Sequence, residues 1–321
     1  MTDFSNEVEA AKALKKAYED LSQEISKKIV GQKDVVRLVI TSIFCNGHSL
    51  LVGVPGLAKT LLVNTLSEAM HLSFNRIQFT PDLMPTDILG AETLDANRKF
   101  VFSKGPIFSN IILADEINRT PPKTQAALLE AMQEKTVTVA GENFTLPKPF
   151  FVLATQNPIE QEGTYPLPEA QLDRFMFNIL LDYPSFEEEI QIIKNTTGNK
   201  KVEIKPILNA QDIINFQELI KKVTVTDNVL EYAVRLVQKT RPNTVNAAAI
   251  TNEFIEWGAG PRAAQFLILG AKCNAILNGK FSPDIEDVQN LAIPILRHRL
   301  MRNFKAEAEG LSTEDIITKL L

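Results

Sequence analysis

The chain has 321 residues, of which 45% are hydrophobic and 23% charged. This composition is typical of globular proteins and excludes the disordered class, and the length predicts two packed units rather than a single core. The net charge is -5, from 34 basic and 39 acidic residues. Because no excess positive charge is available to neutralise a phosphate backbone, nucleic acid is not expected as a partner.

The sequence predicts a cytoplasmic protein without direct membrane insertion. Its first ten residues are polar and acidic, which does not match a secretory signal. No apolar run approaches the roughly 18 residues needed to cross a bilayer. The two cysteines, Cys45 and Cys273, lie far apart in apolar stretches, which favours buried thiols over a disulfide.

The first part of the chain predicts an α/β domain. Apolar residues at three- and four-residue spacing predict an amphipathic helix from about Asn6 to Lys28. Five short apolar runs then predict strands that are buried on both faces. These runs are Ser49–Gly53, Phe74–Phe79, Ile111–Asp115, Phe150–Gln156 and Phe175–Leu181. Helical patterns such as Thr60–Met70 and Thr124–Glu134 separate them, and this alternation predicts a parallel five-stranded sheet.

Two further stretches alternate with a period of two residues around turn-forming residues. One is Glu92–Phe102, around Asp95-Ala96-Asn97, and the other is Thr136–Leu146, around Gly141-Glu142-Asn143. Both predict β-hairpins added to the α/β core.

After Pro184 the pattern predicts helices and no convincing strand. The expected helices are Glu187–Asn195, Asp227–Lys239, Pro261–Leu277, Pro283–Met301 and Thr313–Leu321. Proline and serine punctuate the segment Asp182-Tyr183-Pro184-Ser185. We therefore predict a core domain over residues 1–183 and a helical domain over residues 184–321.

The strongest motif is a phosphate-binding loop. Gly53-Val54-Pro55-Gly56-Leu57-Ala58-Lys59-Thr60 follows a predicted strand and precedes a predicted helix, which is the context a P-loop requires. Glycines let backbone amides wrap phosphates, Lys59 can reach the β- and γ-phosphates, and Thr60 can hold Mg²⁺. Ala58 replaces the usual last glycine. The alternative is an ordinary glycine turn with a lysine nearby.

Two polar strand ends extend this site. The apolar run Ile111–Ala114 ends in Asp115 and Glu116, and unpaired buried carboxylates would be costly. Asp115 fits a Mg²⁺ ligand and Glu116 the base that orients the attacking water. The run Phe151–Gln156 ends in Asn157, whose amide can position water or contact the γ-phosphate. Alone, the first is a solvated strand end and the second an Asn-Pro turn.

With these motifs, the chain resembles the AAA+ ATPases, most closely the MoxR branch, over nearly all of its length. The form of the loop from Gly53 to Thr60, Ala58 included, is similar to that of MoxR proteins. Leu113–Arg119 looks like the Walker B segment and Ala154–Pro158 like sensor 1. The resemblance implies an AAA+ P-loop NTPase core with a C-terminal α-helical lid, and ATP with Mg²⁺ as cofactors.

The resemblance also implies roles for two arginines. Leu172-Asp173-Arg174-Phe175 is similar to the arginine-finger motif, so Arg174 would reach the nucleotide of a neighbouring subunit. The alternative is a strand-edge arginine paired with Asp173. Gly258-Ala259-Gly260-Pro261-Arg262 is similar to sensor 2, although Gly260 replaces a frequent serine. From the residues alone, Arg262 would be a solvated helix-start residue.

Other parts of the nucleotide site also follow from the resemblance. Ile29-Val30-Gly31-Gln32 is similar to the segment that lines the adenine pocket, which implies contacts from Val30 and Gly31; the alternative is a helix end capped by Gly31. The helix start at Leu61 completes the expected cofactor-binding set. The two predicted hairpins look like the inserts that line the central pore of this branch.

The function implied is ATP hydrolysis that remodels, matures or activates a protein client. The resemblance implies a homo-oligomer, as a hexameric ring, and a client with a von Willebrand factor A domain. One alternative is a nucleotide-gated scaffold without productive hydrolysis, which Glu116 and Arg174 argue against. Another is a DNA-directed motor, which the acidic balance argues against.

The histidines His48, His71 and His298 have no metal-ligating neighbours in sequence, so solvated or hydrogen-bonded structural roles are expected and no transition-metal site is indicated. Arg297, Arg299 and Arg302 cluster near the end of the last long predicted helix. Their pattern leaves open a solvated face or a subunit contact.

Overall fold

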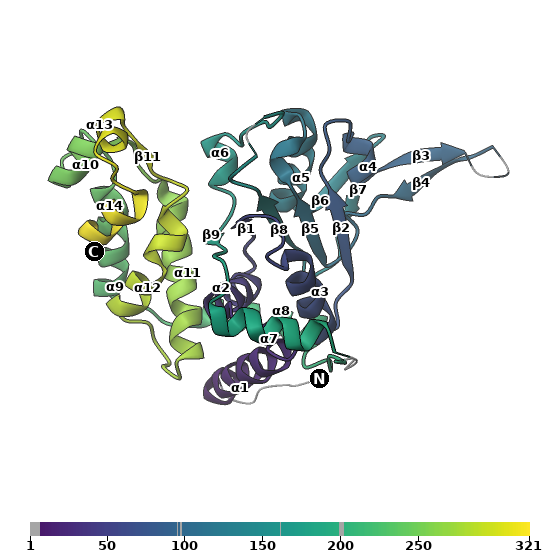
Figure 1. Ribbon diagram of the computed structural model, residues 1–321, viewed down its shortest axis with the longest axis horizontal. Coiled ribbons are helices and arrows are strands. Elements are labelled where there is room, and N and C mark those ends of the chain that lie inside the picture. Colours follow the sequence, from purple (N-terminus) through teal and green to yellow (C-terminus); the bar gives the residue numbers. More distant parts are fainter. Residues whose placement is uncertain (1–6, 95, 97, 161, 199–201) are drawn as a thin grey trace. The chain divides into compact units, whose positions relative to one another are not determined.

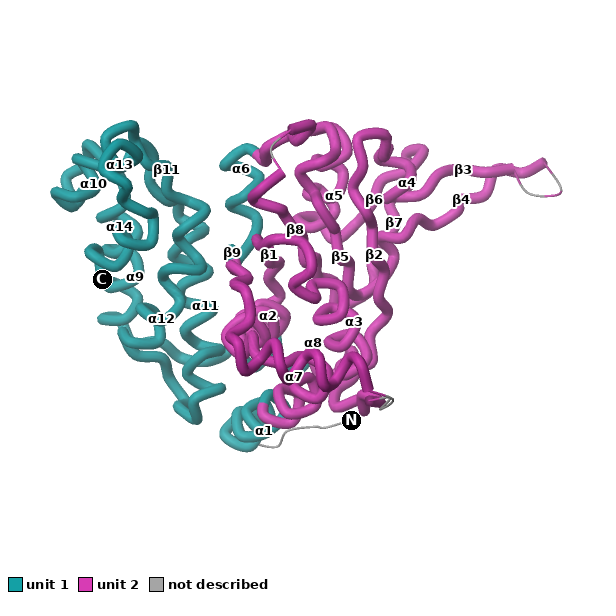
Figure 2. The backbone as a smooth tube through the Cα atoms, viewed as in Figure 1, with its two compact units in different colours: residues 1–18, 168–178, 215–321 teal, residues 19–167, 179–214 magenta. Residues whose placement is uncertain are grey.

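The structure is a computed structural model that describes residues 7–94, 96, 98–160, 162–198 and 202–321. The chain forms two compact units, drawn in different colours in Figure 2. We call residues Glu19–Leu167 with Ile179–Ile214 the sheet unit, and the remainder, which includes Pro168–Asn178 and Asn215–Leu321, the helical unit. A domain boundary at residue 183 stays a prediction.

The sheet unit is built on the five predicted strands, which are confirmed. They are β1 (Ser49–Val52), β2 (Phe74–Gln78), β5 (Ile111–Asp115), β8 (Phe151–Gln156) and β9 (Phe177–Leu180). Their order is β2-β5-β8-β1-β9, and Figure 1 shows them side by side in this order. In the central parallel pairs, Leu113 lies opposite Leu153 and Ser49 also lies opposite Leu153 from the other side.

The centre of the sheet is apolar on both faces. Ile111, Ile112 and Leu113 are fully buried, and β8 is buried from Phe151 through Thr155. Each large aliphatic side chain removed from water contributes about 1.5–3 kcal/mol. This burial fixes where the polar carboxyl ends of β5 and β8 lie, because the apolar parts of these strands cannot shift without exposing the core.

Helices precede, connect and follow the strands along the chain. α1 (Glu7–Ile25) confirms the predicted N-terminal helix, although Asn6 lies outside the described residues. α3 (Lys59–Ala69) and α5 (Pro122–Glu134) confirm the two predicted crossover helices. α2 (Lys33–Phe44), α4 (Pro85–Leu89), the 3-10 turn η1 (Ile117–Arg119) and α7 (Phe186–Thr196) complete the elements around the sheet.

Both predicted hairpins are confirmed as antiparallel pairs. They are β3 (Gly90–Leu94) with β4 (Phe100–Lys104), and β6 (Thr136–Val139) with β7 (Glu142–Thr145). The turn residues Asp95 and Asn97 lie outside the described residues. Phe102 stacks on Phe144 with ring centroids 4.2 Å apart, which joins the two hairpins.

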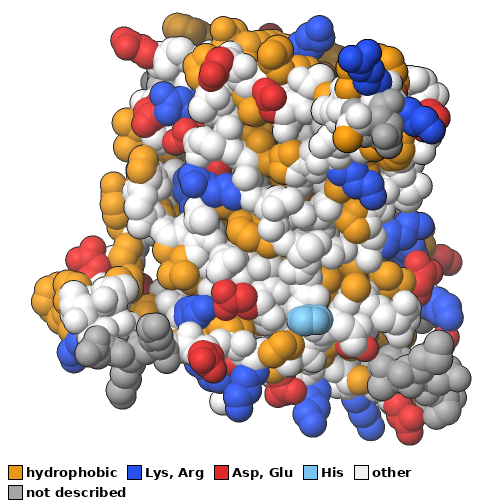
Figure 3. Space-filling model, turned by 90° about the vertical axis from the view of Figure 1, so that its right-hand side faces the viewer, with side chains coloured by type: hydrophobic (Ala, Val, Ile, Leu, Met, Phe, Trp, Pro, Cys, Tyr) orange, Lys and Arg blue, Asp and Glu red, His pale blue; other side chains and the backbone are white. Residues whose placement is uncertain are grey.

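The β3–β4 hairpin projects from the sheet unit (Figure 1) and carries exposed apolar side chains. Phe100 is 72% exposed and Leu94 60% exposed. Figure 3 views the molecule from the side on which this hairpin projects; hydrophobic side chains there are interspersed with charged ones. Leu94 and Phe100 lie opposite each other on the two strands, so the hairpin carries an exposed apolar pair.

The helical unit consists mainly of helices, as predicted. Its long helices are α9 (Asp227–Lys239), α11 (Pro261–Leu277), α12 (Ile285–Leu296) and α14 (Thr313–Leu320). The shorter ones are α6 (Glu169–Leu172), α10 (Ala249–Phe254) and α13 (Phe304–Ala308), and α8 (Ala210–Lys222) begins in the sheet unit. No helix among the described residues has both the length and the apolar content needed to cross a bilayer.

Two expectations for this region are wrong. The helix expected over Pro283–Met301 is α12, which ends at Leu296. A small antiparallel ribbon, β10 (Ile255–Trp257) with β11 (Met301–Arg302), is present where no strand was expected. Both errors involve Met301, which lies after the turn that follows α12 and pairs with Trp257. Strands of two or three residues are too short to show a period.

Candidate nucleotide-binding site

The phosphate loop, residues 53–60, connects β1 to α3. Gly56 and Ala58 adopt left-handed backbone conformations, with φ of 87° and 54°. Gly56 takes this conformation without steric cost, whereas in Ala58 the Cβ makes the left-handed conformation less favourable. α3 then begins at Lys59, so the first turn of the helix leaves amide N–H groups without helical partners. Such amides, aided by the helix dipole, suit a bound phosphate.

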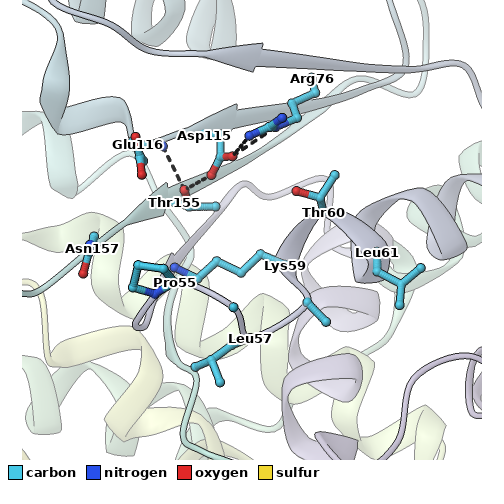
Figure 4. A pocket seen from close by; sticks show the side chains of 12 residues that line it. Pro55, Leu57, Lys59, Thr60, Leu61, Arg76, Asp115, Glu116, Thr155 and Asn157 are labelled. Atoms are coloured by element: carbon cyan, nitrogen blue, oxygen red, sulfur yellow. Dashed lines mark hydrogen bonds and ion pairs between the residues drawn. The ribbon is translucent and has the colours of Figure 1, made fainter. Parts of the chain in front are cut away.

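The loop borders a pocket of about 400 Å³ (Figure 4). The pocket collects predicted residues from three separate parts of the sequence together with two that were not predicted. Its lining is Pro55, Gly56, Leu57, Ala58, Lys59, Thr60, Leu61, Arg76, Asp115, Glu116, Thr155 and Asn157. Gly53 and Val54 belong to the loop but not to this lining. A Cβ on Gly53 would crowd the side chain of Leu181, so the loop starts in close contact with the chain after β9.

Lys59 is half-buried beside the loop. Its Nζ donates a hydrogen bond to the carbonyl oxygen of Gly53. Burial lowers the pKa of Lys59, while the nearby carboxylates of Asp115 and Glu116 act in the opposite direction. A lysine held in this way presents a positive charge where a nucleotide phosphate would lie.

Asp115 ends β5 with a partner for each carboxylate oxygen. Oδ1 accepts a hydrogen bond from the hydroxyl of Thr155 at 2.6 Å. Oδ2 accepts from Arg76, with Nη2 at 2.6 Å and Nε at 3.0 Å. These contacts explain how a strand buried on both faces can end in a carboxylate, because a charge with hydrogen-bonded partners avoids most of the burial cost.

Glu116 adopts a left-handed backbone conformation, with φ of 58°. Its N–H donates to the Thr155 hydroxyl at 2.9 Å, so Thr155 links both acidic residues. Its Oε2 accepts from Gln78 Nε2 at 2.8 Å and from Arg119 Nη1 at 3.2 Å. Because the backbone turns here, the two adjacent carboxylates have different partners, which allows them different roles.

Asn157 lies at the end of β8, is 7% exposed and lines the pocket. Its Oδ1 accepts the backbone N–H of Ile159 at 3.1 Å, which is the turn that an Asn-Pro sequence favours. This contact uses the amide oxygen and leaves the NH₂ group as the hydrogen-bond donor for a ligand.

The donor set of the pocket fits Mg²⁺. The Thr60 hydroxyl and the Asp115 carboxylate line the same pocket, and oxygen atoms of this kind are the ligands that Mg²⁺ takes together with substrate phosphates. Arg76, the present partner of Asp115, has a side chain that is 47% exposed. An ion pair open to solvent to this extent is weak, so it does not prevent Asp115 from binding a cation.

Sequence reasoning missed Arg76, Gln78, Arg119 and Thr155. Arg76 and Gln78 belong to β2, which is an edge strand of the sheet. Their signal is the polar content of the predicted strand Phe74–Phe79, because an edge strand can keep polar side chains that a central strand cannot. Thr155 is a buried hydroxyl within an apolar run, and hydrogen-bond partners of this kind are set by neighbouring strands rather than by the local pattern.

The segment with Val30 and Gly31 precedes α2 and is connected to the phosphate loop by a neighbouring residue. Gln32 Nε2 donates to the carbonyl oxygen of Leu57 at 3.4 Å. Gly31 has φ of 68°, a conformation that suits glycine. Val30 and Gly31 do not line the pocket described above, and their expected contact with adenine stays a prediction.

Arg174 and Arg262 belong to the helical unit, whereas the other predicted site residues belong to the sheet unit. Asp173 does not pair with Arg174, as the simpler interpretation expected, but with Arg262 and Arg299. Among the described residues, the half-buried Arg174 side chain makes neither a hydrogen bond nor an ion pair. The roles of Arg174 and Arg262 toward nucleotide stay predictions.

Arg299 is neither on a solvated face nor at a subunit contact, the two possibilities left open by the sequence. Its side chain is 1% exposed and hydrogen-bonds Asp173 within the same chain. Burial lowers the pKa of Arg299 to about 10, and the Asp173 carboxylate opposes this shift. The basic cluster therefore contains a buried structural arginine.

His48 and His298 have hydrogen-bonded structural roles. His48 Nδ1 accepts the N–H of Val152 at 2.9 Å, so Nε2 carries the proton and donates to Met132 O at 3.1 Å. Burial lowers the pKa of His48 to about 3, and it lowers the pKa of His298 well below the usual value. His298 Nε2 lies 3.0 Å from Phe175 O.

A parallel sheet with a phosphate loop after one strand, and with acidic and amide side chains at the ends of two others, defines a P-loop nucleotide-binding protein. The family described as "ATPase family associated with various cellular activities (AAA)" matches residues 48–177. The AAA lid domain matches residues 247–320.

Individual relatives show to which branch of the AAA family the chain belongs. Chaperone MoxR1 of Mycobacterium tuberculosis is 43% identical over 93% of this chain and 79% of its own length. The uncharacterized protein YeaC of Bacillus subtilis is 42% identical over 93% of this chain and 91% of its own. A crystal structure of a presumed ATPase from Cytophaga hutchinsonii is 44% identical, with a TM-score of 0.91 over 97% of this chain and 95% of that chain. The chain belongs to the MoxR-type AAA+ ATPases.

Proposed function

We propose that this chain hydrolyses ATP to ADP and phosphate, and that it uses the turnover to remodel, mature or activate a protein client. The observation that carries the proposal is the pocket beside the phosphate loop, which brings Lys59, Asp115 and Glu116 together from separate parts of the chain. A protein that only bound nucleotide would not require the second carboxylate.

Each residue of the pocket has a physical role in this reaction. Loop amides and Lys59 hold the β- and γ-phosphates, and Thr60 with Asp115 would hold Mg²⁺, which supplies charge neutralisation at the phosphates. Glu116 orients and polarises the attacking water, and the Asn157 amide donates a hydrogen bond near the γ-phosphate. Catalysis of phosphoryl transfer is mainly positioning and charge stabilisation, and this lining supplies both.

Two arginines complete the proposed site from outside the pocket lining. Arg174 stabilises charge on the nucleotide of a neighbouring subunit, and Arg262 contacts nucleotide in its own subunit. The lack of an ion-pair partner for Arg174 among the described residues supports a role in trans, because a guanidinium without a carboxylate is available to a phosphate. The corresponding assembly is a homo-oligomeric ring, proposed as a hexamer.

The proposed client is a protein with a von Willebrand factor A domain. The family resemblance is the basis for the von Willebrand factor A domain, and the relative that is named a chaperone, MoxR1 of Mycobacterium tuberculosis, supports only a protein client in general. The Glu116→Gln form, which should hold ATP without hydrolysing it, is the reagent for testing this. Binding to a purified von Willebrand factor A domain protein in ATP but not ADP is the expected result, and equal or absent binding in both would contradict it.

The enzymatic proposal is tested by steady-state ATP hydrolysis over a range of protein concentrations, with particle size measured at each point. We expect turnover per chain to rise with assembly and to be lost in Arg174→Ala at every concentration. Arg235→Ala is the matched control, because Arg235 is an exposed arginine of the helical unit paired with Glu231 at 3.2 Å. ATP binding without hydrolysis in the assembled parent would favour a nucleotide-gated scaffold instead.

A further inference from the structure

The Asp173 carboxylate lies between two arginines of the helical unit that differ in how tightly they are held. Oδ1 accepts from Arg299 Nε at 2.7 Å, and Oδ2 accepts from Arg262 Nη1 at 3.3 Å. The Arg299 side chain is 1% exposed and the Arg262 side chain 37% exposed. One contact is short and buried, and the other is long and open to solvent, so the second is the weaker of the two.

Arg299 also fixes the backbone on both sides of Arg174. Its Nη2 donates to the carbonyl oxygens of Asp173 at 2.9 Å and Phe175 at 2.7 Å. The guanidinium lies 5.2 Å from the ring centroid of Phe266, a residue of α11. The backbone that carries Arg174 is therefore attached to α11 and to the turn after α12 (Ile285–Leu296).

α11 carries Arg262 at its first turn. The Asp173 carboxylate accepts from both Arg262 and Arg299, so it connects Arg262 to the arginine that holds the backbone around Arg174. Phe175 and Met176, which follow Arg174 in the chain, are fully buried. A rigid attachment of this kind transmits a displacement of α11 to the backbone of residue 174, because a close-packed interior deforms little.

We propose that Asp173 is a positioning residue that couples these two arginines: it restrains Arg262 until a nucleotide phosphate competes for that guanidinium, and through Arg299 it keeps Arg174 attached to the same helices. The inference rests on the proposed function, which supplies the nucleotide contacts of both arginines. A phosphate offers more charge and a bidentate geometry, so it can displace a carboxylate held at 3.3 Å. In the fraction of molecules in which Asp173 holds Arg262, that arginine cannot contact the nucleotide. Asp173 therefore lowers the apparent ATP affinity in proportion to this fraction.

A double-mutant cycle tests this coupling by equilibrium binding of a fluorescent ATP analogue with Mg²⁺, in a Glu116→Gln background that prevents turnover. Asp173→Asn should tighten binding several-fold when Arg262 is present and should have no effect in Arg262→Ala. Glu231→Gln is the matched control, because it removes a carboxylate from an exposed pair with Arg235. An effect of Asp173→Asn that is absent, or that is equal in both backgrounds, overturns the proposal.

Steady-state kinetics supply a second readout, because a purely structural role would change kcat and ATP affinity together. Arg299→Lys keeps a positive charge beside Asp173 but cannot bridge the two carbonyl oxygens, so we expect kcat to fall several-fold while ATP affinity is unchanged. A fall in affinity equal to the fall in kcat would contradict a role in holding Arg174.

If Asp173→Asn fails to fold, Asp173→Ser would replace it, since this change also removes the carboxylate that holds Arg262 and leaves the hydrogen bonds from Arg299 to the backbone carbonyl oxygens in place. The expected gain in ATP affinity is the same. Absence of ATP binding by the parent would overturn the proposed function and the coupling together. Unchanged affinity in the Asp173 variants, with ATP binding intact in the parent, would overturn only the coupling.

Discussion

The pocket of the sheet unit and the arginine cluster of the helical unit each contain an aspartate bonded to an arginine, but the two pairs differ in burial. Arg76 beside Asp115 is 47% exposed, and Arg299 beside Asp173 is 1% exposed. Water weakens the first pair and leaves the Asp115 carboxylate exchangeable, whereas in the second pair the arginine is excluded from solvent, although the Asp173 side chain is itself 26% exposed. Burial of the arginine, rather than the presence of an ion pair, therefore separates a pair that solvent weakens from one that holds the fold.

The largest effect expected from this comparison is the loss of the buried arginine. Arg299→Ala leaves Oδ1 of Asp173 and several backbone carbonyl oxygens without their donor, so the free energy of unfolding should fall by about 3–5 kcal/mol. Chemical denaturation would measure it. Arg235→Ala, at an exposed pair of the same unit, should change this energy by less than about 1 kcal/mol. Equal effects of the two variants would contradict the role of burial.

A change at the phosphate loop should affect ligand binding far more than stability. Lys59→Ala removes a charged donor whose hydrogen bonds to phosphate are worth about 1.5–3 kcal/mol, so ATP affinity should fall by a factor of about 10–150. Titration with a fluorescent ATP analogue measures this. Lys33→Ala, at the exposed start of α2 (Lys33–Phe44), is the control and should bind ATP as the parent does. Unchanged affinity in Lys59→Ala would argue against the loop as the phosphate site.

Acidification should reveal the buried neutral histidine of the sheet unit. His48 has a pKa of about 3 in the folded chain against 6.5 for the free side chain. Between these values the unfolded chain binds more protons, so stability is lost as pH falls below about 6.5, by up to about 1.4 kcal/mol per pH unit. Denaturant titrations at pH 7, 6 and 5 would measure the slope.

The control for this slope is the exposed histidine at the end of α3. His48→Gln should reduce the loss of stability with falling pH, whereas His71→Gln should leave it as in the parent. A slope that His48→Gln does not change would mean that His48 is not the titrating group.

The smallest expected effect is at the exposed pair of the pocket. Arg76→Ala should change the free energy of unfolding by no more than about 1 kcal/mol, because the guanidinium is nearly half in solvent. Thermal or chemical denaturation would measure it. A loss as large as that of Arg299→Ala would show that the Arg76–Asp115 pair is a structural contact, and would weaken the assignment of Asp115 as a cation ligand.

The sequence predicted the sheet and most of the pocket because both depend on local patterns. Apolar runs marked the five strands, and the loop from Gly53 to Thr60 has a local form that can be recognised without a structure. The acidic pair after Ala114 was informative for the same reason, since carboxylates that end a buried strand require partners.

What the sequence could not predict depends on contacts between distant residues or on very short elements. Arg299 bonds Asp173 across 126 positions, and nothing in the pattern around Arg297 and Arg302 distinguishes a buried arginine from a solvated one. The contact between Arg76 and Asp115 can be recognised only once β2 and β5 are paired in register. The β10–β11 ribbon has too few residues to show a period, so the pattern extends a helix to Met301 and predicts no strand at either segment.

The central claim, that the pocket turns over ATP, is tested most directly by measuring ATP binding and ATP hydrolysis together in the parent and in Glu116→Gln. The account predicts hydrolysis by the parent, and in the variant equal ATP affinity with hydrolysis reduced about 10²–10⁴-fold, because the amide keeps the shape of the side chain but cannot act as a base. Hydrolysis by Glu116→Gln at the rate of the parent would contradict the role of this carboxylate and the catalytic assignment of the pocket.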